Sequence, residues 1–229
     1  MHANAASSAA AVAASRHAGA AQAHHFDSPA QQREAATLGM WVFLVTEIMF
    51  FGGLFLAYVV YRSMFPHAFA AASHELDIVL GTTNTAVLIA SSLTMALAVR
   101  SAQLGRRLSV ILCLILTMAL GGVFLGIKAY EYHHKFVEGL VPGAGFHFPG
   151  PEAPHAAIFF CLYFGLTGLH ALHMIVGEGV LTVMLVMSAR GRFGPQYHNP
   201  IECAGLYWHF VDIVWIFLFP LLYLIGRHG

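Results

Sequence analysis

The sequence has 229 residues, of which 58% are hydrophobic and only 10% are charged, so it is too apolar for an ordinary soluble domain and falls in the polytopic membrane class. Lys and Arg total 11, as do Asp and Glu, and this zero net charge gives no indication of a nucleic-acid partner or an acidic soluble substrate. The three cysteines include no Cys-x-x-Cys pair, which argues against a disulfide framework or a thiolate metal site.

Residues 1–36 are rich in Ala with Ser, Gln and His, and they lack the compact apolar core of a secretory signal. We expect a disordered tail whose histidines are solvated, with metal binding as the weaker alternative. Residues 37–229 are expected to form the folded membrane domain.

Five apolar runs in this domain are each long enough to cross a hydrocarbon layer of about 30 Å, which takes about 20 helical residues. They cover approximately residues 38–61, 78–99, 108–129, 156–187 and 204–225. The predicted fold is therefore all-α, a bundle of five transmembrane helices. The fourth run is longer than the bilayer requires, so we expect this helix to tilt or to project beyond it.

The basic residues divide unequally between the two sides of such a bundle. The seven on the side of the N-terminus are Arg16, Arg33, Arg100, Arg106, Arg107, Arg190 and Arg192. The four on the opposite side are Arg62, Lys128, Lys135 and Arg227. Because excess positive charge marks the cytoplasmic side, the N-terminus is predicted inside and the C-terminus outside. The Gly- and Pro-rich residues 130–155 are predicted to form an ordered, non-helical outer cover.

The first helix carries Glu47 about nine residues past its start, which places this carboxyl roughly 14 Å deep at 1.5 Å per residue. A carboxyl at that depth is expected to be neutral or paired. An intramembrane ionisable group is a candidate for function, here proton handling or control of a lipid pocket. A purely structural hydrogen bond is the alternative.

The second and third helices carry small and polar residues that favour helix packing. Asn84, Ser91 and Ser92 form a stripe that allows close approach and interhelical hydrogen bonds. Gly122-x-x-x-Gly126 is a weak small-residue contact motif. The segment 128–132 (Lys-Ala-Tyr-Glu-Tyr) is interpreted as an interfacial aromatic belt with snorkelling charged ends.

The fourth helix contains His170-x-x-His173, whose side chains share a face and suggest haem or metal binding. A membrane cytochrome with two bis-histidine haems needs four ligands from different helices, however, and the first three helices have no histidine. We therefore expect no metal or haem in this chain.

In the fifth helix, His209 and Asp212 are one turn apart and share a face. That face must meet other protein, a lipid headgroup or water. Hydrogen bonds to neighbouring helices are the simplest account.

Five ordered motifs in residues 38–226 together resemble one family, subunit III of the haem-copper respiratory oxidases. They are residues 46–51 (Thr-Glu-Ile-Met-Phe-Phe), Asn84-Thr85 with Ser91-Ser92, residues 128–132, residues 167–177 and residues 207–215 (Tyr-Trp-His-Phe-Val-Asp-Ile-Val-Trp). The chain is most similar in plan to the short bacterial form of cytochrome c oxidase subunit III. It departs from the seven-helix mitochondrial type by lacking the first two helices, which form one wall of the family's lipid cleft.

The resemblance implies an accessory subunit of cytochrome c oxidase that has no catalytic redox centre of its own. It implies binding to subunit I, with subunit II and a small subunit IV as further partners, and haem and copper in the partner subunits. It also implies a bacterial inner membrane, bound phospholipid and a role in sustained turnover and proton uptake, with Glu47 and His209 near the lipid- or proton-related region.

Other functions remain open at this point. A quinol oxidase subunit III and an accessory subunit of a nitric oxide reductase belong to the same superfamily, although residues 207–215 and the outer loop resemble the cytochrome c branch more closely. A different class is an independent transporter or proton channel built on Glu47, His170, His173 and Asp212.

Overall fold

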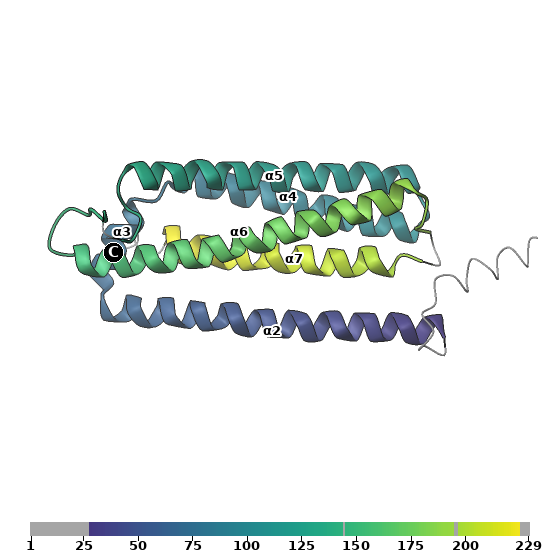
Figure 1. Ribbon diagram of the computed structural model, residues 1–229, viewed down its shortest axis with the longest axis horizontal. Coiled ribbons are helices and arrows are strands. Elements are labelled where there is room, and N and C mark those ends of the chain that lie inside the picture. Colours follow the sequence, from purple (N-terminus) through teal and green to yellow (C-terminus); the bar gives the residue numbers. More distant parts are fainter. Residues whose placement is uncertain (1–27, 144, 195–196, 225–229) are drawn as a thin grey trace, which may run out of the picture. The chain divides into compact units, whose positions relative to one another are not determined.

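The computed structural model describes residues 28–143, 145–194 and 197–224. These residues are helical nearly throughout, and the described β-structure is one isolated bridge between Gly194 and Tyr197. The elements in chain order are α2 (Pro29–Met64), α3 (Pro66–His74), α4 (Ile78–Gln103), α5 (Arg107–Val137), α6 (Ala153–Ala189), α7 (Asn199–Phe219) and the short π-helix η1 (Pro220–Leu224) (Figure 1).

Five helical segments of the described chain are long and apolar enough to cross a membrane, which confirms the predicted fold class. They are Ala30–Met64, Ile78–Gln103, Arg107–Val137, Ala153–Ala189 and Asn199–Leu224. Most extend beyond the predicted runs, because a helix that leaves the hydrocarbon layer continues through polar residues. With 37 residues, α6 is about 55 Å long, more than the layer requires.

The chain groups into two compact units, residues 1–43 and residues 44–229. The described part of the first unit is the start of α2, where Ser28 Oγ accepts a hydrogen bond from the backbone N–H of Gln31 at 3.2 Å. This cap, followed by Pro29 in the first turn, explains why the helix begins there. Residues 29–36 are therefore helical, so that part of the predicted tail is wrong, and residues 1–27 lie outside the described residues.

In the second unit, α4 packs against α5 and α7, and α6 packs against the same two helices, so the four helices form a closed bundle (Figure 1). The buried residues of α5 recur at alternating intervals of four and three: Val110, Leu114, Thr117, Gly121, Phe124, Lys128, Glu131 and Lys135. This spacing is typical of helices that cross at a shallow angle. The largest side chains in the core include Trp208 and Trp215.

Two connections differ from the prediction. The short helix α3 was not predicted, because its nine Ala-rich residues form no long apolar run. It packs against α6, where the ring of Phe69 meets that of Phe159 edge-on at 5.5 Å. The predicted non-helical segment 130–155 is shorter, because α5 continues to Val137 and α6 begins at Ala153. The described non-helical part is therefore residues 138–143 and 145–152.

Candidate functional site

Glu47 of α2 and His173 of α6 form a pair in the interior of their spans. Glu47 Oε2 lies 3.1 Å from His173 Nε2, and the two side chains are 19% and 14% exposed. The ring of Phe51 meets the His173 ring edge-on at 5.2 Å, and Tyr207 O–H donates to the backbone carbonyl of His173 at 3.0 Å. The structure thus brings together two predicted residues that are 126 positions apart in sequence.

The partners of His173 determine how this pair holds its protons. Its Nδ1 is 2.9 Å from the carbonyl oxygen of Leu169, which can only accept, so Nδ1 carries a hydrogen. One further proton is then shared between Nε2 and Glu47: either the carboxylic acid donates to a bare Nε2, or Nε2–H donates to a carboxylate. Both arrangements have zero net charge, which suits a membrane interior where an isolated charge is costly.

His170 belongs to a different environment from His173, although both are on α6. It is fully buried, and its Nε2 donates to the carbonyl oxygen of Val211 in α7 at 3.0 Å. The rings of Phe124 and Trp215 contact it at 5.3 Å and 5.2 Å. His170 therefore ties α6 to α7 within the aromatic core, and the described residues include no cluster of three or more His, Cys, Asp or Glu side chains that could hold a metal ion.

His209 and Asp212 lie together with Ser92 in a groove between α4 and α7. Ser92 Oγ is 2.7 Å from His209 Nδ1, so this pair links the two helices. Asp212 is 3% exposed, and both of its carboxyl oxygens are covered by the protein. The Ser92 hydroxyl lies close enough to act on this carboxyl, although the pair falls short of strict hydrogen-bond geometry. The groove has a volume of about 380 Å³ and otherwise apolar walls.

A polar cluster that was not predicted joins α5, α6 and η1. Lys128 Nζ donates to Glu131 Oε2 at 2.9 Å, to the Tyr163 hydroxyl at 3.2 Å and to the Tyr223 hydroxyl at 3.0 Å. Both tyrosines donate in turn to Glu131 Oε1, at 2.8 Å and 2.5 Å. Lys128 and Glu131 are only 4% and 2% exposed, so the interpretation of this segment as a snorkelling interfacial belt is wrong. The sequence signal for this cluster was the pair of opposite charges, Lys128 and Glu131, which lie three residues apart on one face of α5.

The predicted packing residues divide between the buried seam and the outer faces. Asn84 and Ser91 lie on the buried seam of α4, and Ser91 Oγ accepts from Trp208 Nε1 at 2.9 Å. A Cβ at Gly122 or Gly126 would meet nothing within 4 Å, so these two glycines make no close helix contact within the chain. In α5, the glycine that faces the neighbouring helices is Gly121. One residue further along, the helix has turned by about 100°, so Gly122 does not share that face.

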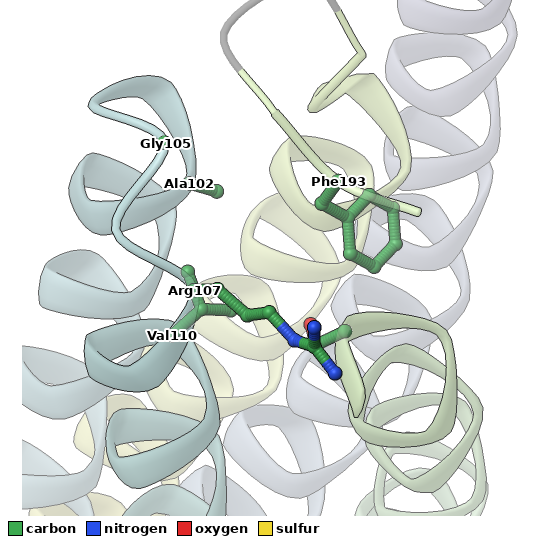
Figure 2. Close-up of a pocket in the computed structure, with 6 residues that line it drawn as sticks. Ala102, Gly105, Arg107, Val110 and Phe193 are labelled. Carbon is green, nitrogen blue, oxygen red and sulfur yellow. The ribbon is translucent and has the colours of Figure 1, made fainter. Parts of the chain in front are cut away.

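A small pocket lies where the start of α5 meets the end of α6 (Figure 2). Arg107 extends from α5 toward α6, where its Nη2 donates to the carbonyl oxygen of Ala189 and closes the helix end. The remaining space is about 10 Å³, room for a single water molecule. This site fastens two helix ends and is too small for a substrate.

The fold and these sites define a polytopic membrane protein with five membrane-length helices, several of whose polar side chains are hydrogen-bonded between helices. A family model described as cytochrome c oxidase subunit III matches residues 19–227. Cytochrome c oxidase subunit 3 of Thermostichus vulcanus is 33% identical over 83% of this chain and 87% of that protein. Cytochrome bo(3) ubiquinol oxidase subunit 3 of Pseudomonas aeruginosa is 32% identical over 89% and 91%, and cytochrome c oxidase subunit 3 of Gallus gallus is 33% identical over 88% and 73%.

The chain belongs to the cytochrome c oxidase subunit III family. It is a subunit III of a respiratory oxidase, and it works in a complex with other oxidase subunits.

Proposed function

We propose that the chain serves a cytochrome c oxidase of a bacterial inner membrane, where it binds the catalytic subunit I together with subunit II and, where the complex has one, a small subunit IV. The match to the family model over residues 19–227 carries this proposal. Bacterial and animal relatives named cytochrome c oxidase subunit 3 support it. Haem and copper belong to the partner subunits, so the contribution of this chain is to stability, lipid binding and proton supply.

The Glu47–His173 pair is the group in this chain best suited to proton handling. It holds one shared proton across 3.1 Å at a partly exposed position inside the spans, with zero net charge in either arrangement. Such a pair can pass a proton between its two members without creating an isolated charge in hydrocarbon. We assign it to the durability of turnover and to bound phospholipid nearby, because electron transfer belongs to the partner subunits.

The proposed orientation places the N-terminus in the cytoplasm and the C-terminus outside. Arg107 bonds to the end of α6, so the α4–α5 and α6–α7 connections lie at the same end of the bundle. Four further arginines border these connections: Arg100, Arg106, Arg190 and Arg192. At the opposite end, Lys128 and Lys135 are buried in ion pairs. This asymmetry favours a cytoplasmic position for the arginine-rich end.

Service in a quinol oxidase is the second candidate, because the Pseudomonas aeruginosa relative named cytochrome bo(3) ubiquinol oxidase subunit 3 is 32% identical over 89% of the chain. Purification of the tagged chain from its native membranes in gentle detergent tests both. We expect it to retain a haem-bearing partner, and the preparation to consume oxygen with reduced cytochrome c. Oxygen consumption with quinol alone would favour the second candidate, and a chain that purifies without haem protein would favour an independent transporter.

The role of the Glu47–His173 pair is tested by Glu47→Gln, with Glu138→Gln as the control at a partly exposed position outside the pair. Glutamine keeps the shape and hydrogen bonding of Glu47 but cannot share the proton. We expect a fully assembled complex whose initial oxygen consumption stays within a few-fold of the unaltered complex, but whose activity decays several-fold faster over many turnovers. Immediate loss of activity in a haem-loaded complex would refute this role, and unchanged decay and lipid content would show that the pair is structural.

A further inference from the structure

One end of the bundle carries a cluster of positive charge that the described chain does not neutralise. Arg100 lies in the last turn of α4, Arg106 directly precedes α5, and Arg190 and Arg192 follow α6. All four side chains are exposed. The ion pairs among the described residues involve lysine or histidine and never an arginine. These four guanidinium groups therefore lack a carboxylate partner within the part of the chain that the structure describes.

Two chain turns hold the arginines in one place. Arg107 donates to the carbonyl oxygen of Ala189, and its Nη1 is 3.4 Å from the position that a Cβ on Gly191 would take. The turn before α5 is thus fastened to the turn after α6 (Figure 2). Gly191 has a φ of 71°, which turns the chain sharply just after the helix ends. Because Arg106 and Arg190 are each next to a fastened residue, the fold limits the distance between them.

The remaining charges show that the two ends of the bundle differ. Glu202 is also at the arginine-rich end, but it accepts from Gln103 Nε2 at 2.6 Å and lies 3.4 Å from His198, so it is already engaged. At the opposite end, Lys128 and Lys135 are both in ion pairs with glutamates. An external anion is therefore attracted to one end only.

The position of the two turns indicates which anion can reach them. The helix α4 has 26 residues and is about 39 Å long, more than the hydrocarbon layer of about 30 Å and close to the roughly 40–45 Å that includes the headgroups. The turns therefore lie at headgroup depth. Beyond them, α5 exposes Leu108 and Leu112, and α6 exposes Val183 and Val186. A ligand with an anionic head and apolar chains matches both surfaces, whereas an acidic peptide matches only the arginines.

We propose that the two turns bind the headgroup phosphate of a phospholipid with net negative charge, with Arg106 on one side and Arg190 and Arg192 on the other. Each guanidinium can direct two parallel N–H donors at phosphate oxygens. The acyl chains lie along the exposed aliphatic residues of α5 and α6. The proposal rests on the proposed function and deepens it, because it gives the lipid class and a second lipid site at the end of the bundle.

Photo-crosslinking of the purified complex in phosphatidylcholine vesicles tests the proposal. The vesicles contain a trace of phosphatidylglycerol with a diazirine at the start of one acyl chain or, as the matched control, phosphatidylcholine with the same diazirine. Within residues 104–112 and 183–192, we expect at least about fivefold more adduct from the phosphatidylglycerol probe, the contribution of one basic residue near a membrane surface. Unlabelled phosphatidylglycerol should compete with the probe, and inorganic phosphate at the same concentration should not.

Three results of this experiment would overturn the proposal. Equal adduct yields from the two probes would mean that lipid covers this surface without selection for charge. Competition by inorganic phosphate would show a site for free anions. The absence of adducts at both turns would mean that another protein covers the arginines in the complex.

Substitutions separate charge from shape at the same positions. The double variant Arg190→Gln/Arg192→Gln should bring the ratio of the two adduct yields close to one, because it removes half of the exposed arginine charge. Arg190→Lys/Arg192→Lys keeps the charge and should retain most of the selectivity. Arg62→Gln, in the last turn of α2, removes one charge elsewhere and should leave the ratio unchanged. An unchanged ratio in the double glutamine variant would contradict the proposal.

Haem content and oxygen consumption, measured in the same preparations, distinguish this proposal from the proposed function. A haem-loaded, active complex without selectivity for phosphatidylglycerol overturns the lipid site alone. Selective adducts in a preparation that contains no haem support the lipid site and overturn the proposed function.

Discussion

Replacing Lys128 with methionine is expected to destabilise the chain by about 3 kcal/mol, the lower end of the 3–5 kcal/mol that removal of one partner costs a buried ion pair. The change removes all three hydrogen bonds of Nζ and its contacts with aromatic rings, among them Trp215 at 5.2 Å. Glu131 is left with its two tyrosine donors, which moderate the loss. Adding Glu131→Leu removes the second charge, and the pair of substitutions should cost less than the sum of the single ones by at least about 1 kcal/mol.

Unfolding of the full chain by sodium dodecyl sulfate in mixed micelles, followed by tryptophan fluorescence, measures these differences because Trp215 packs on the cluster. Lys135→Met is the matched control on the same helix. Its partner Glu138 is 34% exposed, so the carboxylate it leaves behind is solvated and the cost should be about 1 kcal/mol. Equal losses for Lys128→Met and Lys135→Met, or strictly additive losses in the double variant, would refute the assignment of a coupled buried pair.

Three further predictions concern packing, cofactors and topology. Gly121→Ala should destabilise the chain by about 1–3 kcal/mol, because the new Cβ would meet Glu178 and, at 2.9 Å, Trp208, whereas Gly122→Ala should be neutral or slightly stabilising in the same unfolding assay. The chain purified alone should show no haem absorption and no stoichiometric copper or iron by elemental analysis; one bound haem per chain would contradict this. Cysteines introduced beside Arg106 and in residues 139–154 should be labelled from opposite sides of the membrane, and labelling from one side would contradict the proposed orientation.

The five spans were predictable because each is set by a local property, the length of an apolar run. Their ends were not, since a helix persists beyond the hydrocarbon layer wherever backbone hydrogen bonds and side-chain pairs continue to favour it. The last turns of α5 show this: Lys135 donates to Glu138 and to the backbone oxygen of Glu75, so the helix reaches Val137 instead of ending near residue 129. The start of α2 at Pro29 has a similar local cause in the Ser28 cap.

The candidate sites were harder to predict because each depends on which helix face meets which neighbour. Glu47 and His173 were each singled out from the sequence, but their pairing depends on the packing of helices that are far apart in the chain. The Gly122-x-x-x-Gly126 motif was predicted as a weak helix contact, but within this chain its two glycines meet no neighbour, whereas Gly121, Phe124 and Lys128 follow the buried seam. Tracing the alternating four- and three-residue spacing through α5 would have indicated both the correct glycine and the burial of Lys128.

The buried polar groups of this chain differ in how completely their hydrogen-bonding capacity is used. In the Lys128–Glu131 cluster every strong donor of the lysine has an acceptor, so the cluster holds the subunit together and leaves nothing for a partner. Asp212 and Asn84 lie at the other extreme, because the carboxyl oxygens of Asp212 and both amide atoms of Asn84 are buried without a hydrogen-bond partner of strict geometry among the described residues. Such groups have lost their hydration on folding and gain little in return, so they lower the stability of the packing around α4 and α7. Hydrogen bonding, and not burial alone, therefore decides whether a polar side chain stabilises this bundle.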